Sequence, residues 1–238
     1  SSTDLCLHPA FAPNNASNCV HMGASLAAII MVSLRLTSPT GRIVLLPPTP
    51  AEDEAVAALR SHPVVRKFLQ FLPESTTVED VRKRREGRAS DPAIFDLLAF
   101  LRSDDGVLEL AGSTGVFHMD TTQRSCEAGI IIAPKFHGQN LTAEILYTLF
   151  HYIFEEKQFH RISLETSSEN APMRGWLEKV AGMRLEGIRK EWWTDNAGGW
   201  LDVCGYAVLE REWKGWMKQR LLERVNGTKT TSSSPTRS

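Results

Sequence analysis

The chain has 238 residues, 42% of them hydrophobic and 23% charged, a composition typical of a globular protein large enough to bury a full core. Its 27 basic and 28 acidic side chains give a formal net charge of -1, so no basic surface indicates a nucleic acid or an anionic membrane as partner. The four cysteines are scattered and form no CxxC pair, which favours neither a zinc site nor a disulfide framework. A cytoplasmic location is therefore expected.

The beginning of the chain carries almost no charge, since residues 5–34 contain no Asp, Glu, Lys or Arg. Its apolar centre, 26–34, is shorter than the roughly 20 residues that span a bilayer, and no basic residues precede it as they do in a signal peptide. We expect a strand over 29–36 that joins the sheet. Residues 1–22 are expected to be loosely ordered, 23–225 to form one domain, and 226–238 to be a disordered tail.

The first half of the chain predicts short strands and helices. A strand over 42–46 stops at two prolines, and a helix over 51–59 follows. A second helix begins near Thr77 and carries the basic run 82–88, which we interpret as a solvated face. Two further strands, 94–102 and 107–117, are separated by turn residues and predict an antiparallel hairpin.

The second half predicts a crossover between parallel strands. The predicted elements are strands at 127–133, 161–166, 184–193 and 200–209, and helices at 141–158, 173–180 and 211–225. This order favours an α+β fold with a mixed, mostly antiparallel twisted sheet, flanked by helices, in which the strands at 127 and 161 are parallel and splay apart. The last helix either packs on its own sheet or joins two copies, so the protein is expected to be a monomer or a homodimer.

The most informative stretch is 126–146, where an apolar strand leads through a turn at Gly138 into an amphipathic helix. The first turn of a helix has backbone N–H groups without partners and the positive end of the helix dipole. An anionic group such as a phosphate can bind there.

The surrounding residues resemble the GNAT acetyltransferase superfamily, whose pyrophosphate loop reads Gln/Arg-x-x-Gly-x-Gly/Ala. The matching slots here hold Lys135-Phe136-His137-Gly138-Gln139-Asn140. The series Glu127-x-Gly129-Ile130, Phe159-His160-Arg161-Ile162 and Asp202-Val203-x-Gly205-Tyr206 is similar to the branch of ribosomal-protein N-terminal acetyltransferases. The resemblance covers roughly residues 40 to 214.

The resemblance implies a fold of the GNAT type, acetyl-CoA as co-substrate and no metal. The residues implied in cofactor binding are Ile130, Ile131, Ile132, Lys135, His137, Gly138, Gln139, Asn140, Leu141, Thr142, Asn170 and Met173. Two positions depart from the family pattern. Asn140 occupies the second glycine slot, and Met173 stands where many members carry a serine, so no obvious general acid for the departing thiolate is present.

The implied reaction is direct attack of a primary amine on the thioester, and Glu127 is our first choice as base. A salt bridge from Glu127 to Arg124 or Arg161 is the alternative. His118 and Asp120 are second choices near the acceptor, or else surface turn residues. Trp192 and Trp193 line an acceptor pocket or pack in the core, and Cys126 is interpreted as a buried strand cysteine rather than a nucleophile.

The acceptor is open between a small amine or polyamine and a protein N-terminus. We expect neither nucleic acid nor membrane as a partner. A second interpretation is a catalytically idle GNAT fold that binds acyl-CoA or a protein partner, and Asn140 and Met173 are the residues that favour it.

Overall fold

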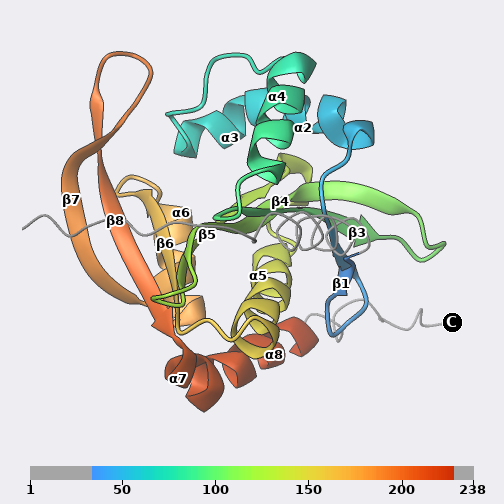
Figure 1. The fold of residues 1–238 in the computed structure, drawn as a ribbon, viewed down its shortest axis with the longest axis vertical. Helices are drawn as coiled ribbons and strands as arrows, with labels where there is room; N and C mark the ends of the chain where they lie inside the picture. Colours follow the sequence, from blue (N-terminus) through green and yellow to red (C-terminus); the bar gives the residue numbers. More distant parts are fainter. Residues whose placement is uncertain (1–33, 228–238) are drawn as a thin grey trace, which may run out of the picture. The chain divides into compact units, whose positions relative to one another are not determined.

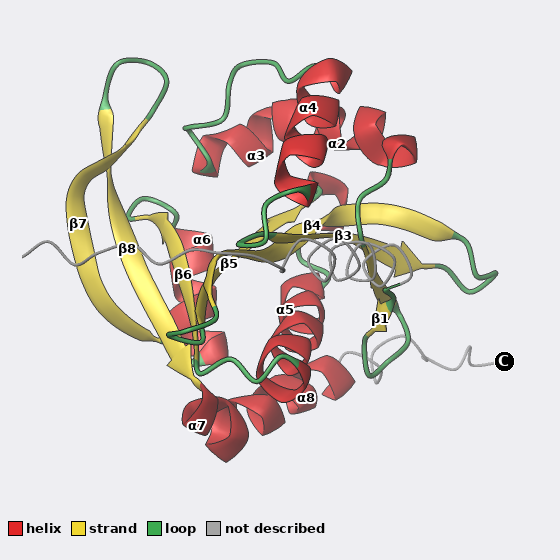
Figure 2. Cartoon of the chain, viewed as in Figure 1, coloured by secondary structure: helices red, strands yellow, loops and turns green. Residues whose placement is uncertain are grey.

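The structure is a computed structural model that describes residues 34–227. Its centre is one eight-stranded sheet with the order β1-β2-β3-β4-β5-β6-β8-β7 (Figures 1 and 2). The strands are β1 (Leu36–Thr37), β2 (Ile43–Leu46), β3 (Phe95–Arg102), β4 (Leu108–Asp120), β5 (Ser125–Ile132), β6 (Arg161–Ser167), β7 (Arg184–Thr194) and β8 (Trp200–Leu209). The predicted segment 1–22, most of the strand expected at 29–36 and nearly all of the tail lie outside the described residues.

The pairing of the strands confirms the predicted fold class. β3 and β4 form the expected antiparallel hairpin, with Phe95 opposite Val116 and Arg102 opposite Leu108. Of the neighbouring strand pairs in residues 34–227, only β5 and β6 are parallel. The sheet is therefore mixed, and mostly antiparallel.

Helices cover both faces of this sheet. α2, α3 and α4 lie on one face, and α5 and α8 lie on the other (Figure 1). The helical segments are Pro50–Glu52 (3-10), α2 (Asp53–Ser61), α3 (Pro63–Phe68), α4 (Val78–Ala89), Pro134–Phe136 (3-10), α5 (Leu141–His151), Tyr152–Glu156 (π), α6 (Ala171–Gly175), Trp176–Ala181 (π), α7 (Glu210–Glu212), Trp213–Met217 (π) and α8 (Lys218–Gly227). α3 is not among the predicted elements. It begins at Pro63, and the ring Nδ1 of His62 accepts a hydrogen bond from the amide of Val64.

The parallel pair is short, and this opens the sheet. The ladder between β5 and β6 runs from Ser125 and Arg161 to Ala128 and Leu164 and then stops. β5 nevertheless continues to Ile132 and β6 to Ser167. The two strands therefore part beyond Ala128, as predicted, and leave edges that face each other without backbone pairing.

The crossover between β5 and β6 is the most buried helix of the fold. From Leu141 to Phe150, α5 is buried at every position except Thr142. Phe154 on the following π-helical turn stacks on Trp213, with the ring centroids 5.7 Å apart. Trp213 is fully buried, so the C-terminal helical segment packs against α5 within the same chain.

No helix within residues 34–227 is long and apolar enough to cross a membrane. In the same part of the chain, no three His, Cys, Asp or Glu side chains come together in a way that could hold a metal ion.

Candidate active site

Two cavities meet at β5. The larger, of about 630 Å³, lies between the helices α2 and α4 and the sheet. The smaller, of about 360 Å³, follows the opening between β5 and β6 and reaches the turn before α5. Both are lined by Ala128, Gly129, Ile130 and Ile131, so this part of β5 is their common wall. Two ligands bound in these cavities would meet at one strand.

The turn before α5 has the backbone of an anion-binding loop. Gly138 has φ +80° and Asn140 has φ +61°, both in the left-handed region that glycine and asparagine tolerate best. The amides of His137 and Gln139 are already hydrogen-bonded to the carbonyls of Pro134 and Phe136. The amides of Gly138 and Asn140 make no hydrogen bond among residues 34–227. These two amides and those of the first turn of α5 are therefore suited to receive an anion, as the sequence predicts.

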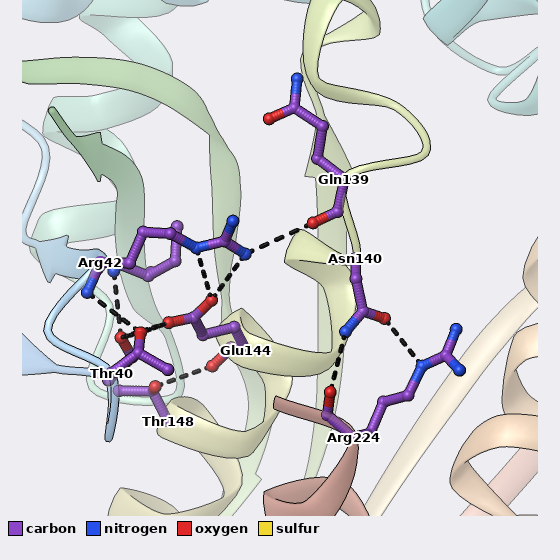
Figure 3. A network of polar contacts seen from close by, with 9 residues as sticks. Thr40, Arg42, Gln139, Asn140, Glu144, Thr148 and Arg224 are labelled. Carbon is purple, nitrogen blue, oxygen red and sulfur yellow. Dashed lines mark hydrogen bonds and ion pairs between the residues drawn. The ribbon is translucent and has the colours of Figure 1, made fainter. Parts of the chain in front are cut away.

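The side chain of Asn140 is held by the C-terminal helix. Its Nδ2 donates to the backbone carbonyl of Arg224 at 3.3 Å, and its Oδ1 accepts from the Arg224 guanidinium at 3.1 Å (Figure 3). Asn140 thus adopts the left-handed conformation that the second glycine slot requires, while both ends of its amide are engaged by α8. The sequence alone gives no sign of this contact, since 84 residues separate the partners.

A buried carboxylate supports the same turn from the other side. Glu144, in the first turn of α5, is 1% exposed, and Arg42 donates to it through Nε at 3.0 Å and a terminal nitrogen at 2.9 Å. Ser38 and Thr40, from the β1–β2 connection, donate to its other oxygen. Arg42 also donates to the carbonyl of Gln139 at 3.3 Å, so this network fixes the turn to the edge of the sheet (Figure 3).

The smaller cavity holds a buried polar group without a partner. Trp176 lines it together with Asn170 and Met173, and the indole Nε1 of Trp176 makes no hydrogen bond among the described residues although it is buried. A buried N–H without an acceptor is costly, and this one is closed off from solvent, so it marks a strained position next to the cavity. Asn170 caps α6 by accepting from the amide of Met173 at 3.2 Å.

Glu127 lies in the larger cavity and has a histidine partner. Its Oε2 is 3.3 Å from Nδ1 of His118, which follows Phe117, the strand partner of Glu127, at an irregularity of β4 and has φ +52°. The Glu127 side chain is 16% exposed and that of His118 is 78% exposed. Burial raises the pKa of the Glu127 carboxyl above its ordinary value, and the contact with His118 offsets part of that rise.

The alternative partners considered for Glu127 are engaged elsewhere. Arg161 binds Glu186, with one of its guanidinium bonds at 3.0 Å, and Arg124 lies 4.0 Å from Glu210. The carboxylate of Glu127 therefore has no arginine ion-pair partner within residues 34–227, which leaves it available to a ligand.

The other residues predicted for the site are divided between the cavities and the surface. Trp192 and Trp193 line the larger cavity with Glu127 and His118. Asp120 does not line it, because its carboxylate accepts the amides of Thr122 and Gln123 at 2.8 Å in its own turn.

Lys135 and Cys126 lie in surroundings that separate them from the predicted cofactor and the predicted chemistry. Lys135 does not line the smaller cavity, and its ammonium is paired with Glu109 on β4. The thiol of Cys126 is buried, and burial raises its pKa to about 12, which agrees with the interpretation as a strand cysteine.

The basic run on α4 contains functional candidates that the sequence reading missed. Arg82 and Lys83 are exposed and pair with neighbouring acids, as expected of a solvated face. Arg84, Arg85 and Arg88, however, line the larger cavity, together with Arg60 from α2. The signal was present, because Val81, a core residue, shares one helix face with positions three, four and seven residues later.

The comparisons with known proteins agree with this arrangement. Residues 42–184 match the family model described as an acetyltransferase (GNAT) domain. A Bacillus subtilis (strain 168) protein named "putative ribosomal protein bS18-alanine N-acetyltransferase" is 40% identical over 88 residues, which is 37% of this chain and 55% of that protein. The chain thus spans about half the length of this curated relative.

Among solved structures, a "putative acetyltransferase" from T. thermophilus is 26% identical with a TM-score of 0.67, covering 80% of this chain and 96% of the other. The spermidine N-acetyltransferase from Vibrio cholerae, solved in complex with CoA and spermine, is 20% identical with a TM-score of 0.63, covering 73% and 98%. The latter identity supports similarity of fold alone. With the family match covering more than half of its residues, the chain belongs to the GNAT acetyltransferase family.

Proposed function

We propose that the protein is an N-acyltransferase that transfers acetyl from acetyl-CoA to a primary amine by direct attack. The observation that carries this proposal is the common wall of the two cavities at 128–131. A thioester in the smaller cavity and an amine in the larger one would meet at β5, close to Glu127. Holding two reactants in this way is a large part of the catalysis of a bimolecular transfer.

The smaller cavity suits coenzyme A in two respects. The parted edges of β5 and β6 offer backbone groups to the amides of a pantetheine arm, as a further strand would. The turn at Gly138 offers amides to a pyrophosphate. The CoA bound in the Vibrio cholerae structure is consistent with this assignment.

Glu127 is the proposed base. The amine nitrogen attacks the thioester carbonyl carbon, the carbon–sulfur bond breaks, and the proton lost by nitrogen passes to the Glu127 carboxylate directly or through a water. His118 is in contact with Glu127 and is largely exposed, so it provides a route for that proton to solvent. No covalent enzyme intermediate is required, and the buried thiol of Cys126 takes no part.

The thiolate leaves without an obvious general acid from α6. Met173 has no proton to give, and an indole N–H remains bonded to its hydrogen at neutral pH. The proton for the thiolate therefore comes from water.

Binding of acetyl-CoA tests the cofactor assignment. We expect isothermal titration calorimetry to detect binding by the wild type, and Gly138→Asp to abolish it by placing a carboxylate against the pyrophosphate. Gly106→Asp is the matched control, because Gly106 has φ +86°, lies in the β3–β4 turn and, like Gly138, has open space around its Cα. No binding by the wild type would contradict the proposal.

The second candidate is an idle GNAT fold that binds acyl-CoA or a protein partner without turnover. Met173, which replaces a proton donor, is the observation that favours it. The release of CoA from acetyl-CoA, followed with small amines, polyamines and peptides with free N-termini, separates the two candidates. Binding without release in any of these reactions would favour the idle fold.

A further inference from the structure

The larger cavity is lined by four arginines and four carboxylates, but these do not all pair with one another. Arg85 binds Asp53 through two hydrogen bonds of 2.9 and 2.8 Å. Arg88 binds Asp96 in the same two-pronged way, with one bond at 2.7 Å. The remaining lining acids are also accounted for, since Glu165 pairs with Arg189 and Glu127 contacts His118.

Two arginines of the cavity remain without a partner. Arg60 on α2 and Arg84 on α4 line the same cavity, and neither makes a hydrogen bond or ion pair within residues 34–227. Asp96 acts on both, but from a longer range and while bound to Arg88. Arg60 is half-buried and Arg84 is exposed, so the cavity presents two guanidinium groups whose N–H donors have no protein acceptor in the described part of the chain.

The surroundings of these two groups disfavour their positive charge. Burial lowers the pKa of Arg60 to about 10, and the nearby charges of Arg84 and Arg88 contribute to the shift. The pKa of Arg84 is lowered in the same direction, by partial desolvation and by the charge of Arg88, although solvent screens the effect because Arg84 is exposed. Arg60 lies in the last turn of α2, where a basic residue is favoured by the helix dipole. The dipole does not explain why its side chain lines a cavity together with a second arginine that has no protein partner in the described part of the chain. An anion between the two groups would remove the repulsion and use their donors.

We propose that this cavity accepts an amine whose own molecule carries an anionic group, a carboxylate or a phosphate, which Arg60 and Arg84 bind. The inference rests on the proposed function, since it names the acceptor class of the same site. The two arginines belong to the helices above the sheet, whereas Glu127 belongs to the sheet itself, so the anion and the reacting amine occupy opposite sides of the cavity.

Arg88 connects the helix α4 with the part of the sheet that carries Glu127. Its guanidinium lies 5.9 Å from the ring centroid of Phe117, and Phe117 pairs with Glu127 across β4 and β5. The basic group of α4 therefore adjoins the strand that carries the proposed base. A polyamine would instead bring further ammonium groups towards unpaired arginines, so spermidine is expected to be a poor acceptor.

Matched acceptors test this inference. One pair consists of the peptide amides Ala-Glu and Ala-Gln, which differ in one carboxylate, and the other consists of glucosamine 6-phosphate and glucosamine, which differ in one phosphate. We expect kcat/KM to be about tenfold to hundredfold higher for the anionic member of at least one pair. The pair that responds identifies the anion as carboxylate or phosphate. Equal rates within both pairs, or spermidine as the fastest acceptor, would overturn the inference.

Arginine variants show whether the preference arises at this place. In Arg60→Gln and in Arg84→Gln the ratio between anionic and neutral acceptor should fall towards one. Lys83→Gln is the control, because it removes a charge from α4 that is exposed, pairs with Glu79 and does not line the cavity. A ratio that stays at the wild-type value in both arginine variants would contradict the assignment.

Binding of inorganic phosphate separates this inference from the proposed function. Titration calorimetry with phosphate should show an affinity at least about tenfold lower in Arg60→Gln and Arg84→Gln than in the wild type and Lys83→Gln. Phosphate bound at the turn of Gly138 would be common to all four proteins and would not alter the comparison. If no acceptor is acetylated but this difference is found, the proposed function fails while the anion site stands. Equal affinities in all four proteins would refute the anion site, whatever the transfer assay shows.

Discussion

Glu127 combines two properties that a base acting on an amine requires. Its carboxylate is largely withdrawn from water, which makes it more basic than an exposed glutamate, and it adjoins the common wall of the two cavities. His118 connects it to solvent without competing for the charge as an arginine would. The exposed His118 thus contacts the buried Glu127 at the proposed point of reaction.

The first prediction concerns the pH dependence of Glu127→Gln. Because the pKa of Glu127 lies above its ordinary value of 4.5, the acid limb of kcat/KM in the wild type should fall above that pH. The variant should lose this limb and about 100-fold or more in kcat. Steady-state rates between about pH 5 and 9 measure both effects.

Asp120→Asn is the matched control for this prediction, because it removes a carboxylate of the same neighbourhood that caps its own turn outside the cavity. It should keep the wild-type profile. An unchanged profile in Glu127→Gln would remove Glu127 as the base.

Glu127 and Gly138 could be proposed from the sequence because both occupy motif positions whose chemistry is local. The sequence could not identify Arg60, since one arginine at the end of a short helix has no pattern of its own. The interpretation of the charge run on α4 as a solvated face is wrong for Arg85 and Arg88, which are largely buried and ion-paired. Arg84 also lines the cavity, but it is exposed, as predicted. Only the packing of α4 over the cavity distinguishes the inward half of the run from the outward half.

At the scale of elements, the turn before α5 depends on parts of the chain far from it in sequence. α8 holds the side chain of Asn140, and the β1–β2 connection holds Glu144. A loop that binds a highly charged group benefits from such support, because its amides must point in one direction before the ligand arrives. Asn140 therefore fits the conformation of the turn and is held there by specific hydrogen bonds.

Substitutions of Asn140 test the backbone requirement. Asn140→Gly should bind acetyl-CoA within about threefold of the wild type, since glycine adopts φ +61° freely. Asn140→Val should bind about tenfold more weakly, because the left-handed conformation costs an ordinary residue about 1–2 kcal/mol. Titration calorimetry measures both constants.

Gln139→Val provides the control for the β-branched side chain, since Gln139 is adjacent and does not share the positive φ of Asn140. It should bind with nearly wild-type affinity. Wild-type affinity in Asn140→Val would show that the left-handed residue is dispensable.

The elements themselves were largely predictable, because strand alternation and helical periodicity are local signals. The sheet, the parallel pair and the long crossover helix all followed from them. The irregularity at His118 did not, since it depends on how β4 twists against β5 and leaves no mark on the hydrophobic pattern. The same holds for α3, a helix of six residues too short for a periodic signal.

At the scale of the whole molecule, the helices over the larger cavity are joined by a nearly buried ion pair. Asp53 on α2 and Arg85 on α4 have side chains that are 7% and 15% exposed. The hydrogen bonds from Arg85 hold the pKa of Asp53 below its ordinary value of 3.8. The pair therefore favours the folded state when Asp53 is ionised.

This pair predicts a specific dependence of stability on pH. Since the folded pKa of Asp53 is lowered, its contribution is fully present above the unfolded pKa of about 3.9 and is lost as the pH falls through the folded value. Asp53→Asn should destabilise the fold by about 3 kcal/mol at neutral pH, because Arg85 is left nearly buried and unpaired. The difference from the wild type should shrink below about pH 4.

Urea unfolding at a series of pH values measures this dependence. Asp104→Asn, in the exposed turn between β3 and β4, removes a carboxylate that forms no ion pair in the described part of the chain and should leave the curve unchanged. A constant difference between Asp53→Asn and wild type at all pH values would contradict the assignment of the linkage to Asp53.

The support of the turn by Ser38, Thr40 and Arg224 also defines the smallest fragment worth expressing. The family match spans 42–184, yet all three residues lie outside it. β8, which separates β6 from β7 in the sheet, lies outside it as well. A fragment limited to residues 42–184 would keep the sequence of the loop but lose the residues that hold its conformation. Without β8, the edge of β6 would be unpaired and prone to association with other chains. The family match covers only the shared part of the sequence, whereas the residues that support the proposed ligand-binding turn lie both before and after it.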